Sequence, residues 1–301
     1  MPLLRAAPLL SMALGALLVS CGSEEASAPS VKPSPEPSAK ATTATNVREP
    51  SGPAHADTVQ PPPVEQRVAF VAADGTRLAA SLWAPRGGAE LAVLLVHQLG
   101  SDRGEWRPFV EALLRRRPRP VILALDLRGH GESTGGGQGK LQWRRFTRDD
   151  WERLPADVMA ALDFLASRSE LRTPRTVVIG SSIGGSAAFL AALHDRPYKD
   201  PRIDAVGWLS PGRAYHGLDV LSPAARYGRR PFAAFVARGE VPAVETAEAL
   251  ARVLPKAAVR RYPGDAHGVA MLKEAPALLQ DVLAFVEDPE GFVAGGGGGQ
   301  P

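Results

Sequence analysis

The chain has 301 residues, of which 45% are hydrophobic, and this is enough for one globular domain with terminal extensions. Its formal net charge of +3 is too small, and its arginines are too scattered and without an aromatic stacking pattern, to favour a nucleic-acid partner. Its single cysteine excludes an internal disulfide.

The first 21 residues have the pattern of an export signal. One positive charge, Arg5, precedes an apolar run to Leu18 that is too short for a comfortable membrane span. The segment Leu-Val-Ser-Cys that ends at Cys21 resembles the bacterial lipobox, in which the cysteine is lipidated and becomes the mature N-terminus. This resemblance implies a lipid-anchored protein of the bacterial cell envelope, and Gly22, in place of an aspartate, implies the outer membrane. The alternative is an ordinary secretory signal.

Residues 22–65 are rich in Ser, Ala, Pro and Thr and show neither helical nor strand periodicity. Such a composition cannot bury enough apolar surface to fold, so we predict a disordered tether. The predicted organisation is a signal peptide over residues 1–21, the tether over 22–65, a folded domain over 66–288 and a glycine-rich tail over 289–301.

In the folded domain, apolar runs typical of strands alternate with helical patterns. An opening hairpin is expected around the turn Asp74-Gly75. Later buried strands are expected at residues 91–96, 121–125, 176–179, 203–209, 232–237 and 258–262, and helices at residues 108–115, 150–167, 186–193, 244–253 and up to about 286. This alternation predicts an α/β fold, with a mostly parallel sheet covered by helices on both faces. In such sheets the chemistry lies at the carboxyl ends of the strands.

One strand end carries the Gly-x-Ser-x-Gly pattern Gly180-Ser181-Ser182-Ile183-Gly184. A short strand before it and an apolar helix after it are the context that a nucleophile elbow requires. Ser182 would lie at the apex of the turn with strained backbone angles, and the amide of Ile183, at the helix N-terminus, would point at an oxyanion formed beside it. The pattern alone also fits a glycine-rich turn before a core helix.

A serine hydroxyl needs an adjacent base to remove its proton, and the chain has six histidines. His267 follows the last expected strand and comes after Ser182 in the chain, so we predict it as the general base. The other histidines are His55 in the tether, His194 about three helical turns beyond Ser182, His216 in a strand-to-strand connection and expected at the surface, and His97 and His130 in loops near the site.

Four segments together carry a resemblance to a known family. They are His97-Gln98-Leu99-Gly100, the run Asp-Leu-Arg-Gly-His-Gly-Glu-Ser over residues 126–133, the pattern at 180–184, and Ala266-His267-Gly268. In this order and spacing, residues 68–286 resemble an α/β-hydrolase, close to the dienelactone-hydrolase and serine-esterase branch. The short connection between residues 209 and 232 implies that the lid of related lipases is minimal or absent.

The resemblance also implies roles for the loop over residues 97–100. It makes the backbone amide of Leu99 the second oxyanion donor, and it makes His97 and His130 architectural residues. Many relatives have glycine where this chain has Gln98. The Gln98 side chain could aim its amide at the substrate or cap the loop, and the sequence leaves both open.

The acidic member of the expected triad departs from the family pattern. Relatives usually have an aspartate a few residues after the strand that corresponds to 232–237, but residues 238–245 contain none. Glu240 is the best-placed carboxylate, and glutamate serves in some relatives. Glu245 is expected to begin the next helix. The reserves are Asp219 and Asp265.

The sequence therefore predicts a serine hydrolase that cleaves a carboxylic ester or a related acyl substrate through an acyl-enzyme at Ser182. His267 and Glu240 would complete the triad, and no metal or organic cofactor is expected. The expected partners are a small-molecule acyl substrate and the membrane, through lipidated Cys21. The alternative is a catalytically inactive, lipid-anchored binding protein that keeps the fold.

Overall fold

The computed structural model describes residues 61–136, 139–171, 173–195 and 202–295. The predicted signal peptide, Cys21 and most of the predicted tether lie outside the described residues. Among the helices of the described ranges, none combines the length and the hydropathy that a membrane span needs.

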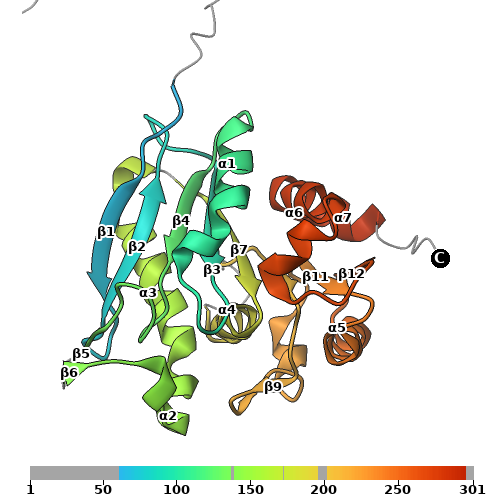
Figure 1. Cartoon of the computed structure of the whole chain (residues 1–301). Coiled ribbons are helices and arrows are strands. Elements are labelled where there is room, and N and C mark those ends of the chain that lie inside the picture. Colours follow the sequence, from blue (N-terminus) through green and yellow to red (C-terminus); the bar gives the residue numbers. More distant parts are fainter. Residues whose placement is uncertain (1–60, 137–138, 172, 196–201, 296–301) are drawn as a thin grey trace, which may run out of the picture. The chain divides into compact units, whose positions relative to one another are not determined.

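A mostly parallel sheet runs through the middle of the folded domain (Figure 1). In spatial order its main strands are β1 (Gln66–Val71), β2 (Arg77–Trp83), β4 (Val121–Leu125), β3 (Leu91–Val96), β7 (Arg175–Ser181), β8 (Ala205–Leu209), β11 (Phe232–Ala237) and β12 (Ala257–Tyr262). β1 and β2 form the expected antiparallel hairpin, and the neighbouring strands from β4 to β12 pair in parallel. The prediction of an α/β fold with a mostly parallel sheet is confirmed.

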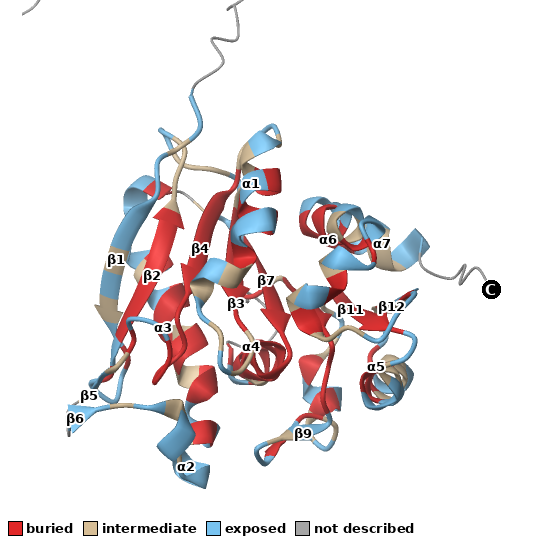
Figure 2. Cartoon of the chain, viewed as in Figure 1, coloured by how far each residue is buried: buried red, intermediate tan, exposed pale blue. Residues whose placement is uncertain are grey.

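Helices cover both faces of the sheet, so the strands are buried while the outer sides of the helices are exposed (Figure 2). They are α1 (Arg107–Arg115), α2 (Arg148–Glu152), α3 (Leu154–Ser167), α4 (Ile183–His194), α5 (Val241–Val253), α6 (Ala277–Glu287) and α7 (Pro289–Ala294). Residues of α3, α4 and α5 pack into one buried cluster, and residues of α1 and α6 pack into another. The smaller strands are β5 (Gly135–Gly136), β6 (Gly139–Lys140), β9 (Ala214–Tyr215) and β10 (Leu218–Asp219).

Most expected elements differ from the observed bounds by at most three residues, and two differences are larger. The helix expected over residues 150–167 is divided at Arg153 into α2 and α3, because Pro155 in the first turn of α3 favours a new helix start. Residues 289–294, expected in the glycine-rich tail, form α7, which packs against α6, β11 and β12. The ring of Phe292 lies 5.5 Å from that of Phe285. The folded domain therefore extends to Ala294.

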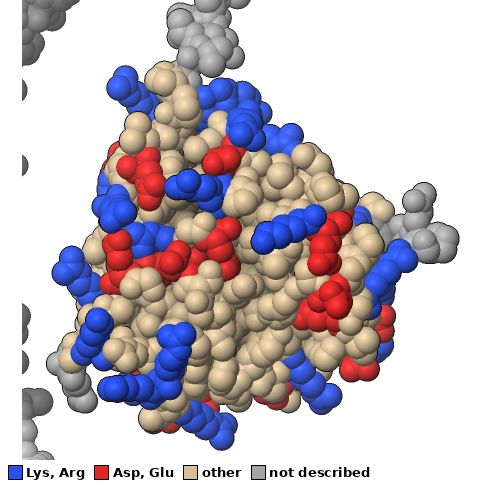
Figure 3. Space-filling model, viewed as in Figure 1, with Lys and Arg blue, Asp and Glu red and all other residues tan. Residues whose placement is uncertain are grey.

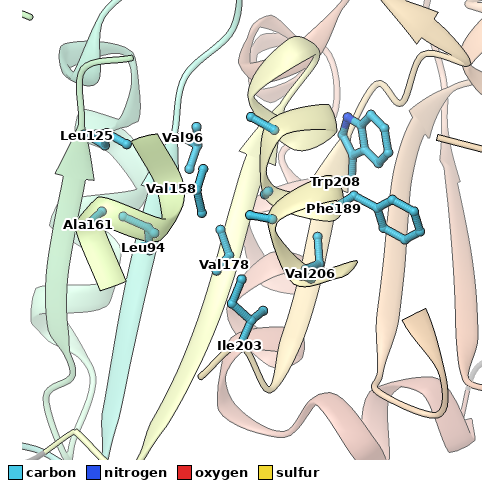
Figure 4. Packing of buried hydrophobic residues seen from close by; sticks show 14 of the residues in the cluster. Leu94, Val96, Leu125, Val158, Ala161, Val178, Phe189, Ile203, Val206 and Trp208 are labelled. Atoms are coloured by element: carbon cyan, nitrogen blue, oxygen red, sulfur yellow. The ribbon is translucent and has the colours of Figure 1, made fainter. Parts of the chain in front are cut away.

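Alternate residues of the central strands pack on opposite faces of the sheet. Val178 belongs to the cluster beneath α3 and α4, whereas Val177 and Ile179 belong to the cluster beneath α1 and α6. Figure 4 shows Phe189 of α4 beside Trp208 of β8, and their ring centroids are 6.1 Å apart. Burial on both faces explains why these strands are continuous apolar runs in the sequence.

Charged side chains of both signs are interspersed on the face shown in Figure 3. One ion pair lies in the interior, where Arg128 donates from Nε to Oδ1 of Asp157 at 2.8 Å. The side chains of Arg128 and Asp157 are 3% and 0% exposed, and Nη1 of Arg128 also donates to Asp74 at 2.7 Å. This network fixes the loop after β4 to α3 and to the hairpin turn.

A buried histidine joins the loops that follow β3 and β4. His97 accepts the N–H of Leu127 at Nε2 (3.0 Å) and donates from Nδ1 to the carbonyl of Gln98 (2.7 Å). Its ring lies 5.0 Å from that of His130, which stacks on Trp143. Burial lowers the pKa of both histidines to about 4. These contacts agree with an architectural role for His97 and His130.

The pKa of His97 predicts a specific pH dependence of stability. Unfolded His97 takes up a proton near pH 6.5, but the buried ring does so only near pH 4. Its contribution to the free energy of unfolding is therefore present above pH 6.5 and is lost as the pH falls toward 4. This loss lowers the wild-type free energy of unfolding by on the order of 3 kcal/mol between pH 7 and pH 4. We expect the loss to be absent in His97→Gln, as measured by urea unfolding at both pH values.

The control is His194→Gln, because His194 is exposed at the end of α4. This variant should follow the wild-type pH dependence. If His97→Gln also follows it, His97 does not titrate in the way described.

Candidate active site

The turn between β7 and α4 depends on close backbone approaches. A Cβ at Gly180 would lie 2.4 Å from the Cα of Gly185, and one at Gly184 would lie 2.3 Å from the carbonyl oxygen of Val96. Real Cβ atoms do not tolerate such contacts, so glycine is required at both positions. Between them, Ser182 has φ 51° and ψ −121°, the strained conformation that was expected.

Two hydrogen bonds with β8 hold the strained peptide in place. The N–H of Ser182 donates to the carbonyl of Leu209 at 2.8 Å, and the indole N–H of Trp208 donates to the carbonyl of Ser182 at 2.8 Å. Both donors and acceptors are buried, so the conformation of Ser182 is determined by its surroundings.

The structure brings His267 and Glu240 together. Nδ1 of His267 lies 2.5 Å from Oε1 of Glu240, whose side chain is only 15% exposed. Glu240 immediately precedes α5, at the end of the β11 loop, and His267 lies in the loop that follows β12. The carboxylate oxygen is therefore placed to accept a proton from Nδ1 and to leave Nε2 free to act as a base.

The other carboxylates considered for this position lie elsewhere. Asp219 accepts hydrogen bonds from the backbone of Leu221 and from the hydroxyl of Ser222. Asp265 and Glu245 are exposed. Among the contacts of the described residues, neither carboxylate bonds to the ring of His267.

Ser210 supports this pair and was not recognised in the sequence. Its hydroxyl donates to Oε2 of Glu240 at 2.6 Å and accepts the N–H of Gly268 at 2.8 Å. Ser210 is fully buried and has a positive φ of 54°. One hydroxyl thus connects the residue after β8 with the loops of both His267 and Glu240. The available signal was its place directly after β8, between the ends of β7 and β11.

A small cavity of about 250 Å³ brings the expected groups together. Its lining residues are Gln98, Leu99, Ser182, Ile183, Tyr215, His216 and His267. Among the hydrogen bonds of the described residues, none engages the backbone amide of Leu99 or that of Ile183. Both amides are therefore available to a ligand in the cavity.

The hydroxyl of Ser182 has no hydrogen bond to the ring of His267 among the contacts of the described ranges. In enzymes without bound substrate, such catalytic contacts are often long and tighten only in the substrate complex. Both residues line the same cavity.

Gln98 holds its loop against the neighbouring segments. Its side-chain oxygen accepts the hydroxyl of Ser181 at 3.1 Å, and a Cβ at Gly268 would lie only 2.1 Å from this oxygen. The side-chain oxygen therefore holds the loop in place through Ser181, which was one of the two possibilities. The residue also lines the cavity.

Tyr215 is a cavity residue that the sequence analysis did not identify. It lies in β9, in the short connection between β8 and β11, and its ring packs so closely over Gly212 that a Cβ there would lie 2.1 Å from it. The ring centroid is 6.4 Å from that of His267. Burial raises the pKa of the Tyr215 hydroxyl, although a hydrogen bond with the Ser182 side chain opposes the rise.

His216, the next residue, is exposed as expected but also lines the cavity. Its ring stacks on Trp151 with a centroid distance of 4.0 Å and an interplanar angle of 12°. In the described part of the chain, groups of three or more His, Cys, Asp or Glu side chains do not gather in a metal-binding arrangement.

Several solved hydrolase structures are similar to this chain. An esterase from Pyrococcus furiosus is 20% identical, with a TM-score of 0.60 over 76% of this chain and 92% of that chain. A dienelactone hydrolase from Anabaena variabilis is 21% identical, with a TM-score of 0.60 over 75% and 98%. An enol-lactonase from Burkholderia xenovorans is 18% identical, with a TM-score of 0.56 over 73% and 100%. These likenesses show the fold.

No curated protein matches the chain significantly. A profile of the alpha/beta hydrolase family matches residues 93–295, which is more than half of the chain. The matched range contains the strained turn at Ser182, Glu240 and His267. The expectation drawn from the four sequence segments is confirmed, and the chain belongs to the alpha/beta hydrolase family.

Proposed function

We propose that the protein is a serine hydrolase of the carboxylesterase type, which cleaves a carboxylic ester or a related acyl substrate through an acyl-enzyme at Ser182. The observation that carries the proposal is the shared cavity. Ser182 and His267 line it together with Leu99 and Ile183, while Glu240 contacts the far side of the imidazole. Family membership supports a hydrolase.

In the proposed reaction, Oγ of Ser182 attacks the carbonyl carbon of the substrate and its proton passes to Nε2 of His267. The amides of Leu99 and Ile183 donate hydrogen bonds to the negatively charged carbonyl oxygen of the tetrahedral intermediate. His267 then gives its proton to the leaving alkoxide. Glu240 holds the required tautomer and stabilises the imidazolium, and a water molecule repeats the sequence to release the acid.

The size of the cavity supports a short acyl group. Its volume of about 250 Å³ lies below the 300–1,000 Å³ that is usual for sites of drug-sized ligands. The β8–β11 connection contains only the β9–β10 hairpin and a 3-10 helix over Ala224–Tyr227, in keeping with the minimal lid that was expected. The names of the similar structures, an esterase and an enol-lactonase, also support an ester or lactone substrate.

We also propose that Cys21 is lipidated and anchors the protein in the bacterial cell envelope, at the outer membrane. The support for this is the sequence of residues 1–22: a charge, a short apolar run, and a lone cysteine in a lipobox-like segment. One acyl chain binds a membrane only marginally, whereas several chains on one cysteine give stable anchoring.

Ser182→Ala should abolish labelling by a fluorophosphonate probe and should lower the turnover of short p-nitrophenyl esters by about a thousandfold or more, because the nucleophile and base act as a unit. The labelled residue is identified by mass spectrometry. The matched control is Ser186→Ala, which lies one turn further along α4 and whose buried hydroxyl has no partner in the described structure. It should label normally.

Two results would contradict this prediction. Labelling that survives Ser182→Ala but is lost in Ser181→Ala would move the nucleophile by one residue. A wild-type protein that neither labels nor turns over any short ester would favour the inactive binding protein instead.

Glu240→Gln should lower kcat by about a hundredfold or more with a similar KM, because the acid orients the imidazole rather than binding substrate. The kinetics of ester hydrolysis measure this. Glu245→Gln is the matched control, since Glu245 is exposed in α5, and it should behave as wild type. If Glu240→Gln is near wild type while Asp219→Asn or Asp265→Asn collapses activity, the acid lies elsewhere.

Cys21→Ser should accumulate as an unprocessed precursor that takes up no labelled fatty acid, because the acceptor thiol is missing. Metabolic labelling and gel mobility in a bacterial host measure both effects. Ser23→Ala, two residues later, should still be processed and labelled. Normal processing of the wild type without label would indicate an ordinary secretory signal.

A further inference from the structure

One half-buried carboxylate near the cavity has no part in the reaction proposed above. Glu105 lies in a 3-10 helix over Arg103–Trp106, directly after the loop that carries Leu99. Carboxylates are rarely buried without a partner, because an ion loses its hydration there. The partners of Glu105 therefore indicate what it does.

The main partner is the backbone of the oxyanion loop. Oε1 of Glu105 accepts the N–H of Gln98 at 2.9 Å, and the Ser101 side chain also donates to the carboxylate. This contact fixes the peptide unit that precedes the Cα of Gln98.

The peptide unit that follows this Cα is fixed from the other side. The carbonyl of Gln98 accepts Nδ1–H of His97 at 2.7 Å and the N–H of Ser101 at 3.2 Å. In a planar trans peptide, the N–H of Leu99 points away from that carbonyl. Glu105 and His97 together therefore set the direction of the Leu99 amide, which is one of the two proposed oxyanion donors.

The same hydrogen bonds act on the charge of Glu105. Burial raises the pKa of Glu105 to about 7, and Asp102 at the N-cap of the 3-10 helix adds to the rise. The hydrogen bonds from Ser101 and from the N–H of Gln98 oppose it, because they stabilise the carboxylate. His267 acts in the same direction.

We propose that Glu105 is a positioning residue of the hydrolase, which holds the Leu99 amide in the cavity through its hydrogen bond with the N–H of Gln98. This inference rests on the proposed function and deepens it.

Two substitutions test this role. Glu105→Ala removes the acceptor, so kcat for p-nitrophenyl acetate should fall by about tenfold or more with little change in KM, since a lost oxyanion donor costs about 10²–10³. Glu105→Gln keeps an acceptor oxygen for the N–H of Gln98, so most of kcat should return.

Glu111→Ala and Glu111→Gln are the matched controls, because Glu111 is an exposed glutamate of the adjacent helix α1. Both should keep the wild-type kcat and KM. A merely structural role of Glu105 would lower the melting temperature of its variants without the split between kcat and KM and without the return of kcat in Glu105→Gln.

The outcomes are distinguishable from failure of the proposed function. An active wild type with unchanged kinetics in both Glu105 variants overturns the inference alone. A wild type that neither turns over the ester nor reacts with a fluorophosphonate overturns the proposed function and this inference with it. If Glu105→Ala does not fold, Glu105→Asp takes its place, because the shorter side chain withdraws the carboxylate from the N–H of Gln98.

Discussion

The crossing of β7 and α4 is a backbone contact that only glycine permits at Gly180 and Gly184, and the candidate site depends on it. Because no Cβ separates the two elements, the chain reverses within one residue and Ser182 adopts a strained conformation. The same crossing leaves the amide of Ile183 at the open start of α4. The position of Ser182 in the cavity and one available amide therefore follow from a single close approach, which hydrogen bonds with β8 stabilise.

Much of the fold could be predicted because burial on both faces produces continuous apolar runs, and β3 and β4 were located at their observed bounds. Ser182, Glu240 and His267 could be selected because each follows a parallel strand, and such strands end at one edge of the sheet. Their catalytic roles remain proposals. This topology is enough to predict that Glu240 and His267 meet, because a glutamate side chain at the start of α5 is long enough to contact the imidazole.

Other parts of the site could not be predicted, because the interactions that define them join residues without a periodic signal. Ser210 gains its importance from contacts with two loops that lie far along the chain, and Tyr215 enters the cavity through a two-residue strand. Glu105 resembles any helix-start glutamate until its hydrogen bond with Gln98 is known. The helix α7 was missed because its glycine-containing sequence is stabilised by packing, with Phe292 against Phe285.

The short connection between Leu209 and Phe232 allows the shape of the cavity to change while the main sheet stays the same. It supplies Tyr215 and His216 to the cavity, yet it forms no strand of the main sheet. Lengthening a surface loop costs little additional closure entropy, so insertions here would enlarge or reshape the cavity at small expense in stability. Substrate range and fold can therefore diverge independently in descendants of this chain, by changes of loop length alone.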